Sequence, residues 1–152
     1  MMRSTGYRGD QGFTLIEMLI VIVVISILIG VLLPSFRGTQ DEAAEQRARS
    51  EMRTIATAIE SYYIHNSNAL PANLTALVSA SPRILNVVPD DPFRSATDYS
   101  YARDSGGTPV YYVVWSYGRD RAAGITGIST AGALTGTQGD DLCVTNGTAS
   151  TC

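Results

Sequence analysis

The chain has 152 residues and a formal net charge of −3, and all 11 of its basic residues are arginine. This acidic balance does not indicate nucleic acid as the principal ligand. Beyond an apolar N-terminal segment, the length leaves room for one small domain and for no second one.

An apolar run over residues 13–36 follows a short polar leader over residues 1–12. As a helix, this run reaches roughly 36 Å, and a bilayer core needs about 30 Å. A secretory signal is a poorer interpretation, because its apolar core has about 7–15 residues and a small-residue cleavage site follows it. Arg3 and Arg8 in the leader favour a cytoplasmic N-terminus, so the rest of the chain is expected outside the cytoplasm.

Glu17 carries the only formal charge in this run. A carboxylate costs about 2.5–3.5 kcal/mol at the centre of a membrane helix, and somewhat less near its end. A plain single-span anchor explains the length of the run but gives Glu17 no role, unless the group is protonated or lies at headgroup level. A subunit that packs against copies of itself inside the bilayer has a use for it.

One long helix is expected from about Thr14 to about His65, and its inner half is the membrane segment. Gly30 and Pro34 predict a bend or a locally loosened helix, because proline removes a backbone donor and clashes with the preceding turn.

Residues 37–68 are expected to continue this helix in amphipathic form. Glu45 and Arg49 stand four residues apart on the polar face, in the order that favours an ion pair. The apolar stripe, which recurs with a helical period, consists of Ala44, Ala48, Met52, Ile55, Ile59 and Tyr62.

Residues 69–152 are expected to form a β-rich domain, which makes the fold class α+β. A short helix is expected over Asn73–Ser79, with Asn73 as its N-cap. Two strands joined by a Gly-Gly turn predict a β-hairpin. The expected strands are Tyr99–Arg103, Val110–Tyr117, Ile125–Ile128 and Leu142–Val144.

Chemistry of the catalytic kind is not evident in the sequence. The single histidine, His65, stands near the predicted helix end without a neighbouring nucleophile, and nucleotide-binding and zinc patterns do not occur. We therefore do not expect an enzyme. In an oxidising compartment, Cys143 and Cys152 are expected to form one disulfide worth roughly 2–3 kcal/mol, and two free thiols are the alternative.

The residues Gly12-Phe13-Thr14-Leu15-Ile16-Glu17, placed between a polar leader and an apolar run, resemble the class III signal of type IV pilins and type II secretion pseudopilins. The resemblance implies a pilin fold, in which the long helix packs on a small antiparallel sheet. It also implies that a prepilin peptidase cuts between Gly12 and Phe13 and methylates Phe13. Glu17 would then pair with the N-terminal amine of a neighbouring subunit.

The function that the resemblance implies is that of a structural subunit in a type IV pilus or a secretion pseudopilus. Such a subunit is stored in the inner membrane lipid, with its C-terminal domain outside the cytoplasm. It assembles with copies of itself and with minor pilins. Its other expected partners are the prepilin peptidase, a platform protein and an ATPase.

Two segments near the C-terminus, Trp115–Asp120 and Gly139–Leu142, resemble the calcium loop of G-type major pseudopilins. The resemblance implies calcium ligation by Asp120, Asp140 and Asp141. The chain departs from that pattern at Arg121, where the family usually has glycine, and an acidic solvated loop is the alternative. The terminal cysteine loop resembles type IV pilins instead.

A second hypothesis is a minor pilin at the filament tip that binds DNA or a surface. Exposed arginines would serve it, and nucleic acid would then be a ligand of the pilus. The presence of Glu17 and the small size of the domain favour a repeated shaft subunit. The arginines in question are Arg94, Arg103, Arg119 and Arg121.

Overall fold

The computed structural model describes residues 12–94 and 96–148, and for residues 33–37 it describes the backbone alone. The chain divides into two compact units, Met1–Thr39 and Gln40–Cys152.

The helix α1 extends over Leu15–His65, which confirms the predicted long helix within one residue at its start. Its backbone remains helical through residues 30–34. The bend expected at Gly30 and Pro34 stays a prediction, and the side chain of Pro34 lies outside the described ones.

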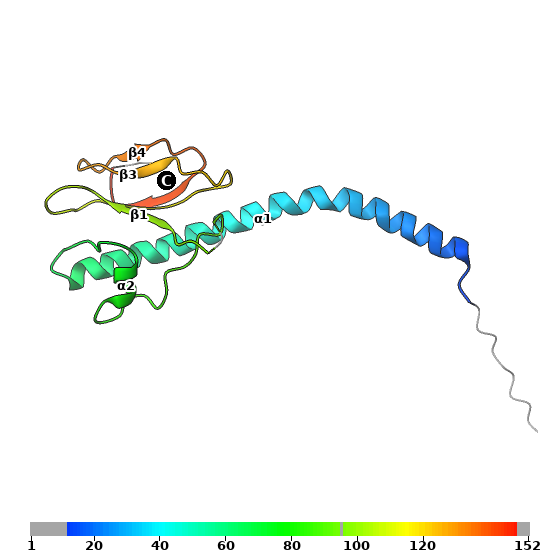
Figure 1. Cartoon of the computed structure of the whole chain (residues 1–152), viewed down its shortest axis with the longest axis horizontal. Coiled ribbons are helices and arrows are strands. Elements are labelled where there is room, and N and C mark those ends of the chain that lie inside the picture. The colour runs from blue at the N-terminus through cyan, green and yellow to red at the C-terminus, as the bar shows by residue number, and fades with distance from the viewer. Residues whose placement is uncertain (1–11, 95, 149–152) are drawn as a thin grey trace, which may run out of the picture. The chain divides into compact units, whose positions relative to one another are not determined.

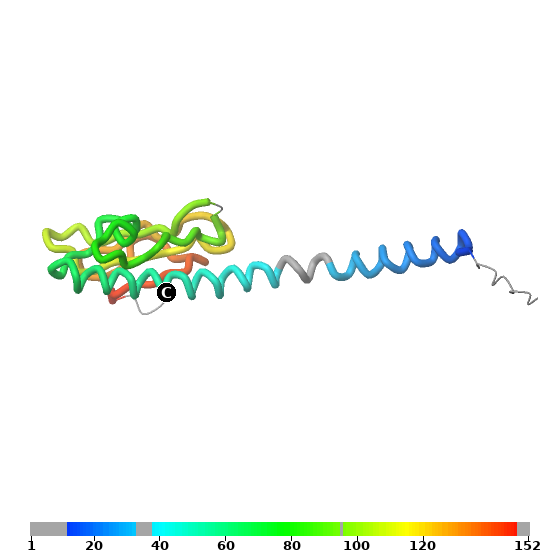
Figure 2. Tube along the Cα trace, turned by 90° about the horizontal axis from the view of Figure 1, so that it is seen from below, coloured from blue at the N-terminus to red at the C-terminus, as the bar shows by residue number. Residues whose placement is uncertain are grey.

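In the second unit, the C-terminal part of α1 lies along a three-stranded antiparallel sheet, as Figures 1 and 2 show. The sheet has the order β1-β2-β5, and a separate two-stranded sheet pairs β3 with β4. This arrangement confirms the α+β fold. The strands are β1 (Ser100–Arg103), β2 (Tyr112–Ser116), β3 (Ile125–Ile128), β4 (Leu134–Gly136) and β5 (Leu142–Thr145).

The predicted apolar stripe of α1 forms the centre of the larger core. Ala48, Met52, Ile55 and Ile59 are completely buried, and Ala44 and Tyr62 pack against them half-buried. Their partners on the sheet are Tyr112, Val114 and Leu142.

Strand β2 is buried on both faces. Its residues Tyr112 and Val114 face the helix, whereas Val113 and Trp115 pack with Ile125 and Ile128 of β3 in a second core. The domain therefore has three layers: helix, three-stranded sheet and two-stranded sheet.

Two buried aspartates explain why β2 is shorter than the predicted Val110–Tyr117. The N–H groups of Val110 and Tyr111 donate to Asp104 Oδ2, both at 2.8 Å, instead of joining the sheet. At the other end, the N–H of Tyr117 donates to Asp91 Oδ2 at 3.1 Å.

Three local expectations need correction or extension. The short helix α2 covers Thr75–Ser79 and so starts two residues later than predicted, although Asn73 Oδ1 still accepts a bond of 3.0 Å from the N–H of Ala76. Glu45 forms its ion pair with Arg119, at 3.2 Å, rather than with Arg49. Strand β4 was not predicted, because its three residues, Leu-Thr-Gly, show no strand pattern.

Candidate functional site

The junction between leader and helix is open to an enzyme. A Cβ atom added at Gly12 would meet no atom of the described residues within 4 Å, and the side chain of Phe13 is 77% exposed. A glycine without close neighbours lets the peptide bond between Gly12 and Phe13 enter a deep active site. The geometry is compatible with cleavage there, and cleavage and methylation stay predictions.

The first turn of α1 presents Glu17 at the end of an apolar helix. Thr14 immediately precedes the helix, and its Oγ1 accepts a hydrogen bond of 3.3 Å from the N–H of Glu17. In a capping box, the N-cap hydroxyl accepts a bond from the N–H of the third helical residue, which is often a glutamate. Thr14 and Glu17 occupy these two positions. The carboxylate of Glu17 is exposed in the single chain.

The segment Leu15–Leu32, which includes Glu17, has a mean hydropathy of 3.1 over its 18 residues. None of this segment is buried within the chain. It is long and apolar enough to cross a membrane. Exposed leucine, isoleucine and valine side chains surround the helix on all sides, which is typical of a helix whose apolar surface is covered by lipid or by other helices.

The second candidate site is the pair of loops that hold Asp120, Asp140 and Asp141. The structure brings these loops together, since Asp140 Oδ2 accepts a bond of 2.8 Å from the N–H of Asp120. A Cβ atom on Gly118 would lie only 2.3 Å from the carbonyl oxygen of Asp140, so the backbones are in contact.

Asp141 is 3% exposed, unlike the other two aspartates of this site. Its Oδ2 accepts bonds from the N–H groups of Gly124, at 2.8 Å, and Ile125, at 2.6 Å. Burial raises the pKa of the Asp141 carboxyl, and the charges of Asp140 and Asp120 act in the same direction. Conversely, the backbone N–H of Asp120 helps to hold the pKa of Asp140 below its ordinary value.

These residues do not fit a calcium ion as they are arranged. Within the described part of the chain, no three histidine, cysteine, aspartate or glutamate side chains are grouped so that they could hold a metal. Calcium prefers six to eight oxygen ligands, whereas here the carboxylates bind backbone N–H groups. We derive no step through calcium, and its binding stays a prediction from the resemblance.

Cys143 in β5 is disulfide-bonded and 4% exposed. Its predicted partner, Cys152, lies outside the described residues, so the pairing itself stays a prediction.

Three of the four arginines considered for a tip-binding role contact other residues of the fold, through an ion pair, a hydrogen bond and a cation–π contact. Arg119 pairs with Glu45, Arg103 donates to the carbonyl oxygen of Leu70 at 3.1 Å, and Arg94 lies 4.2 Å from the ring centre of Tyr117. These contacts favour a structural role over a free cationic surface.

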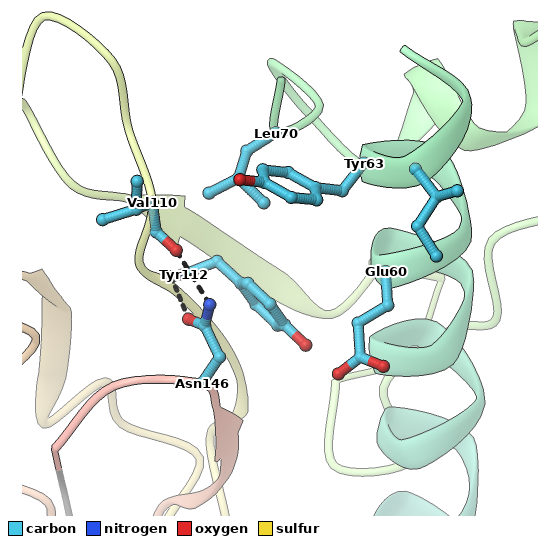
Figure 3. A pocket seen from close by; sticks show the side chains of 7 residues that line it. Glu60, Tyr63, Leu70, Val110, Tyr112 and Asn146 are labelled. Carbon is cyan, nitrogen blue, oxygen red and sulfur yellow. Dashed lines mark hydrogen bonds between the residues drawn. The ribbon is translucent and has the colours of Figure 1, made fainter. Parts of the chain in front are cut away.

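A pocket of about 370 Å³ lies between the end of α1 and the β1–β2 hairpin (Figure 3). Figure 3 shows the ring of Tyr112 between Asn146 and Glu60. Burial, together with the Glu60 charge, raises the pKa of Tyr112 to about 12. The amide of Asn146 is occupied, because it donates to the carbonyl of Val110 and accepts from the N–H of Tyr112, both at 2.8 Å.

Several polar residues that hold the domain together were not singled out from the sequence. They are Asp91, which is 1% exposed, Asp104, which is 4% exposed, and the pair of Glu51 with Tyr99. The turn at Ser105–Thr108 offers a signal for Asp104, because an aspartate before a turn commonly binds backbone N–H groups.

Comparison with known proteins agrees with the N-terminal motif and with the fold. Residues 7–33 match the model of the prokaryotic N-terminal methylation motif, and residues 35–131 match that of type II secretion system protein G. No solved structure gives a significant match.

Curated relatives point the same way. The type II secretion system core protein G of Vibrio cholerae is 27% identical over 68% of this chain and 80% of its own length. The core protein G of Pectobacterium carotovorum is 32% identical over 63% of this chain and 68% of its own length. The competence protein ComGC of Halalkalibacterium halodurans is 39% identical over 47% of this chain and 69% of its own length. With its processing motif, its pilin-like α+β fold and the match over residues 35–131, the chain belongs to the type II secretion protein G family of pseudopilins.

Proposed function

We propose that this chain is a repeated structural subunit of a type II secretion pseudopilus. The observation that supports this most is the protein G match, which covers residues 35–131 and thus most of the folded domain. The apolar helix Leu15–Leu32 anchors the subunit in the inner membrane before assembly, with the domain in the periplasm. The role is structural rather than catalytic.

A prepilin peptidase cuts between Gly12 and Phe13 and methylates the new amine. Glu17 then becomes the fifth residue of the mature chain. Because both an amine and a carboxylate are costly inside a membrane or an apolar filament core, they offset each other only when juxtaposed. Pairing between Glu17 of one subunit and Phe13 of the next therefore fixes the register of the filament.

Assembly exchanges lipid for the helices of neighbouring subunits around residues 15–32. Lipid tails and packed side chains are similarly apolar, so burial contributes little net driving force. The partners that we assign are further copies of this chain, minor pilins, the platform protein and the ATPase of the machine.

The test replaces Glu17 in cells that carry the complete secretion machine. Glu17→Ala and Glu17→Gln should be cleaved and methylated normally, as mass spectrometry of the membrane fraction would show, but should not yield filaments. Glu17→Asp, which keeps the charge, is the matched control and should retain partial assembly. Wild-type filament numbers with Glu17→Ala would refute the pairing role.

A further inference from the structure

Two buried polar atoms in the second unit have no hydrogen-bond partner among the described residues: Trp115 Nε1 and Asp141 Oδ1. The side chains are 7% and 3% exposed, respectively. Leaving such a group without a partner costs about 1–3 kcal/mol, and more for a charged one. Trp115 Nε1 can only donate a hydrogen bond, and Asp141 Oδ1 accepts one.

The register of β2 with β5 places the two residues close to each other at one end of the three-stranded sheet. Trp115 of β2 stands opposite Cys143 of β5, and Asp141 comes two residues before Cys143. Asp141 immediately precedes β5, and diagonal neighbours on paired strands lie within reach of an aromatic side chain. The backbone contact between Gly118 and Asp140 shows that the segment after β2 and the segment before β5 stay side by side beyond the end of β2.

Strand β3 links them a second time. The N–H of Ile125 donates to Asp141 Oδ2 at 2.6 Å, and the side chain of Ile125 packs in the same core cluster as Trp115. The free oxygen of Asp141 therefore belongs to a carboxylate fixed at the edge of the core that surrounds the indole ring.

We propose that one buried water joins Trp115 Nε1 to Asp141 Oδ1 and so fastens the segment between β2 and β3 to the start of β5. A water that accepts from the indole N–H and donates to the carboxylate satisfies both atoms at once. A cation would satisfy the carboxylate alone, because an indole N–H cannot ligate a metal.

This link makes Trp115 and Asp141 positioning residues for the two loops that resemble a calcium site. Together with the bonds to Gly124 and Ile125, the water gives both oxygens of Asp141 a partner. The loops are then ordered by hydrogen bonds from the chain and from one water.

The test uses the full chain, labelled with ¹⁵N, in detergent micelles. Trp115 is the single tryptophan, so it gives one indole N–H resonance. This proton should exchange with solvent at least ten times more slowly than in a free indole, and it should show a cross-peak to a long-lived water. Exchange at the rate of a free indole, or no such cross-peak, would contradict the proposal without any variant.

A matched pair of variants then assigns the partner. Asp141→Asn should shift the indole resonance, whereas Asp140→Asn, which changes the exposed neighbour, should leave it in place. Trp115→Phe combined with Asp141→Asn should change the thermal midpoint by less than the sum of the single changes. A saturable shift of the indole resonance on adding Ca²⁺ that disappears in Asp141→Asn would overturn the proposal and assign Asp141 Oδ1 to a cation.

Discussion

Thr14 Oγ1 accepts a hydrogen bond of 3.3 Å from the backbone N–H of Glu17, three residues further along the chain. An N–H group without a partner costs several kcal/mol in lipid, where water cannot replace the bond. Thr14, which caps the first turn, thus also orders the turn that carries Glu17, the residue for which we propose a role in assembly.

Replacing Thr14 tests this relationship. Thr14→Val removes the cap, so the first turn should fray and the filament yield should fall, whereas Thr14→Ser keeps the hydroxyl and should retain assembly. Filaments are counted by electron microscopy, with N-terminal mass spectrometry to check that processing is normal. Equal yields from the valine and serine variants would show that the cap has no part in assembly.

The bond between Tyr99 and Glu51 fixes the segment before β1 to the helix. The Tyr99 hydroxyl donates to Glu51 Oε2 at 2.7 Å, while Arg47 donates to Oε1 of the same carboxylate from a side chain that is 58% exposed. Tyr99→Phe should lower the free energy of unfolding by about 1.5–3 kcal/mol, since the acceptor is charged and partly buried.

Arg47→Ala is the matched control on the same carboxylate. Exposed ion pairs are worth about 0–1 kcal/mol, so this variant should unfold almost like the wild type in urea. A larger loss for Arg47→Ala than for Tyr99→Phe would contradict the ranking of the two contacts.

Asp104 should make stability depend on pH. The N–H groups of Tyr111, Gly106 and Val110 hold the pKa of the Asp104 carboxyl below its ordinary value of 3.8. Because the pKa of Asp104 is lower in the folded chain than in the unfolded chain, its ionised carboxylate stabilises the fold, and this stabilisation is complete above the unfolded pKa. The stabilisation is lost as the pH falls through the folded pKa.

The corresponding experiment compares Asp104→Asn with the wild type by thermal unfolding between pH 2 and pH 8. The wild type should be the more stable of the two at neutral pH, by a constant margin down to about pH 5, and the margin should shrink below about pH 4. A margin independent of pH would show that the charge of Asp104 does not contribute.

Arg121 adopts a left-handed backbone conformation, with φ of 58°, in the loop after Asp120. Glycine adopts this conformation without strain, although it also makes the unfolded chain more flexible. Arg121→Gly should therefore raise the free energy of unfolding by about 0.5–1 kcal/mol. A destabilised Arg121→Gly would mean that the arginine side chain contributes more than its backbone strain costs.

Gly118→Ala, at φ of 64°, is the opposite case in the same loop. The new Cβ atom would meet the carbonyl oxygen of Asp140 at 2.3 Å, so the variant should lose more than about 1 kcal/mol. Chemical unfolding of both variants at one pH compares them directly. A Gly118→Ala variant as stable as the wild type would show that the two loops are not in close contact.

The long helix and most of the strands could be predicted because their signals are local. The stripe from Ala44 to Tyr62 has the helical period, and the β-prone residues around Val113 mark β2. The ends of β2 depend instead on Asp91 and Asp104, whose side chains replace partners in the sheet, and this competition is decided by tertiary contacts. The same holds for Glu45, whose partner Arg119 lies 74 residues away.

The site was predictable to the extent that it is a sequence motif. Gly12, Phe13 and Glu17 lie within six consecutive residues, and their spacing alone indicates the processing signal. The arrangement around Asp141 was not predictable, since it depends on β3 bringing the N–H of Ile125 against a carboxylate 16 residues later. The resemblance to a calcium loop indicated that Asp120, Asp140 and Asp141 lie close together. It did not indicate that backbone N–H groups bind their carboxylate oxygens.

We propose that the chain matures at Phe13 and then becomes a filament subunit. Mass spectrometry of filaments sheared from cells that express the complete machine tests it most directly. We predict abundant chain that begins at methylated Phe13 in the filament fraction, and the same mature chain without filaments for Glu17→Ala. A chain that retains Met1 in cells whose other prepilins are cleaved would contradict the claim.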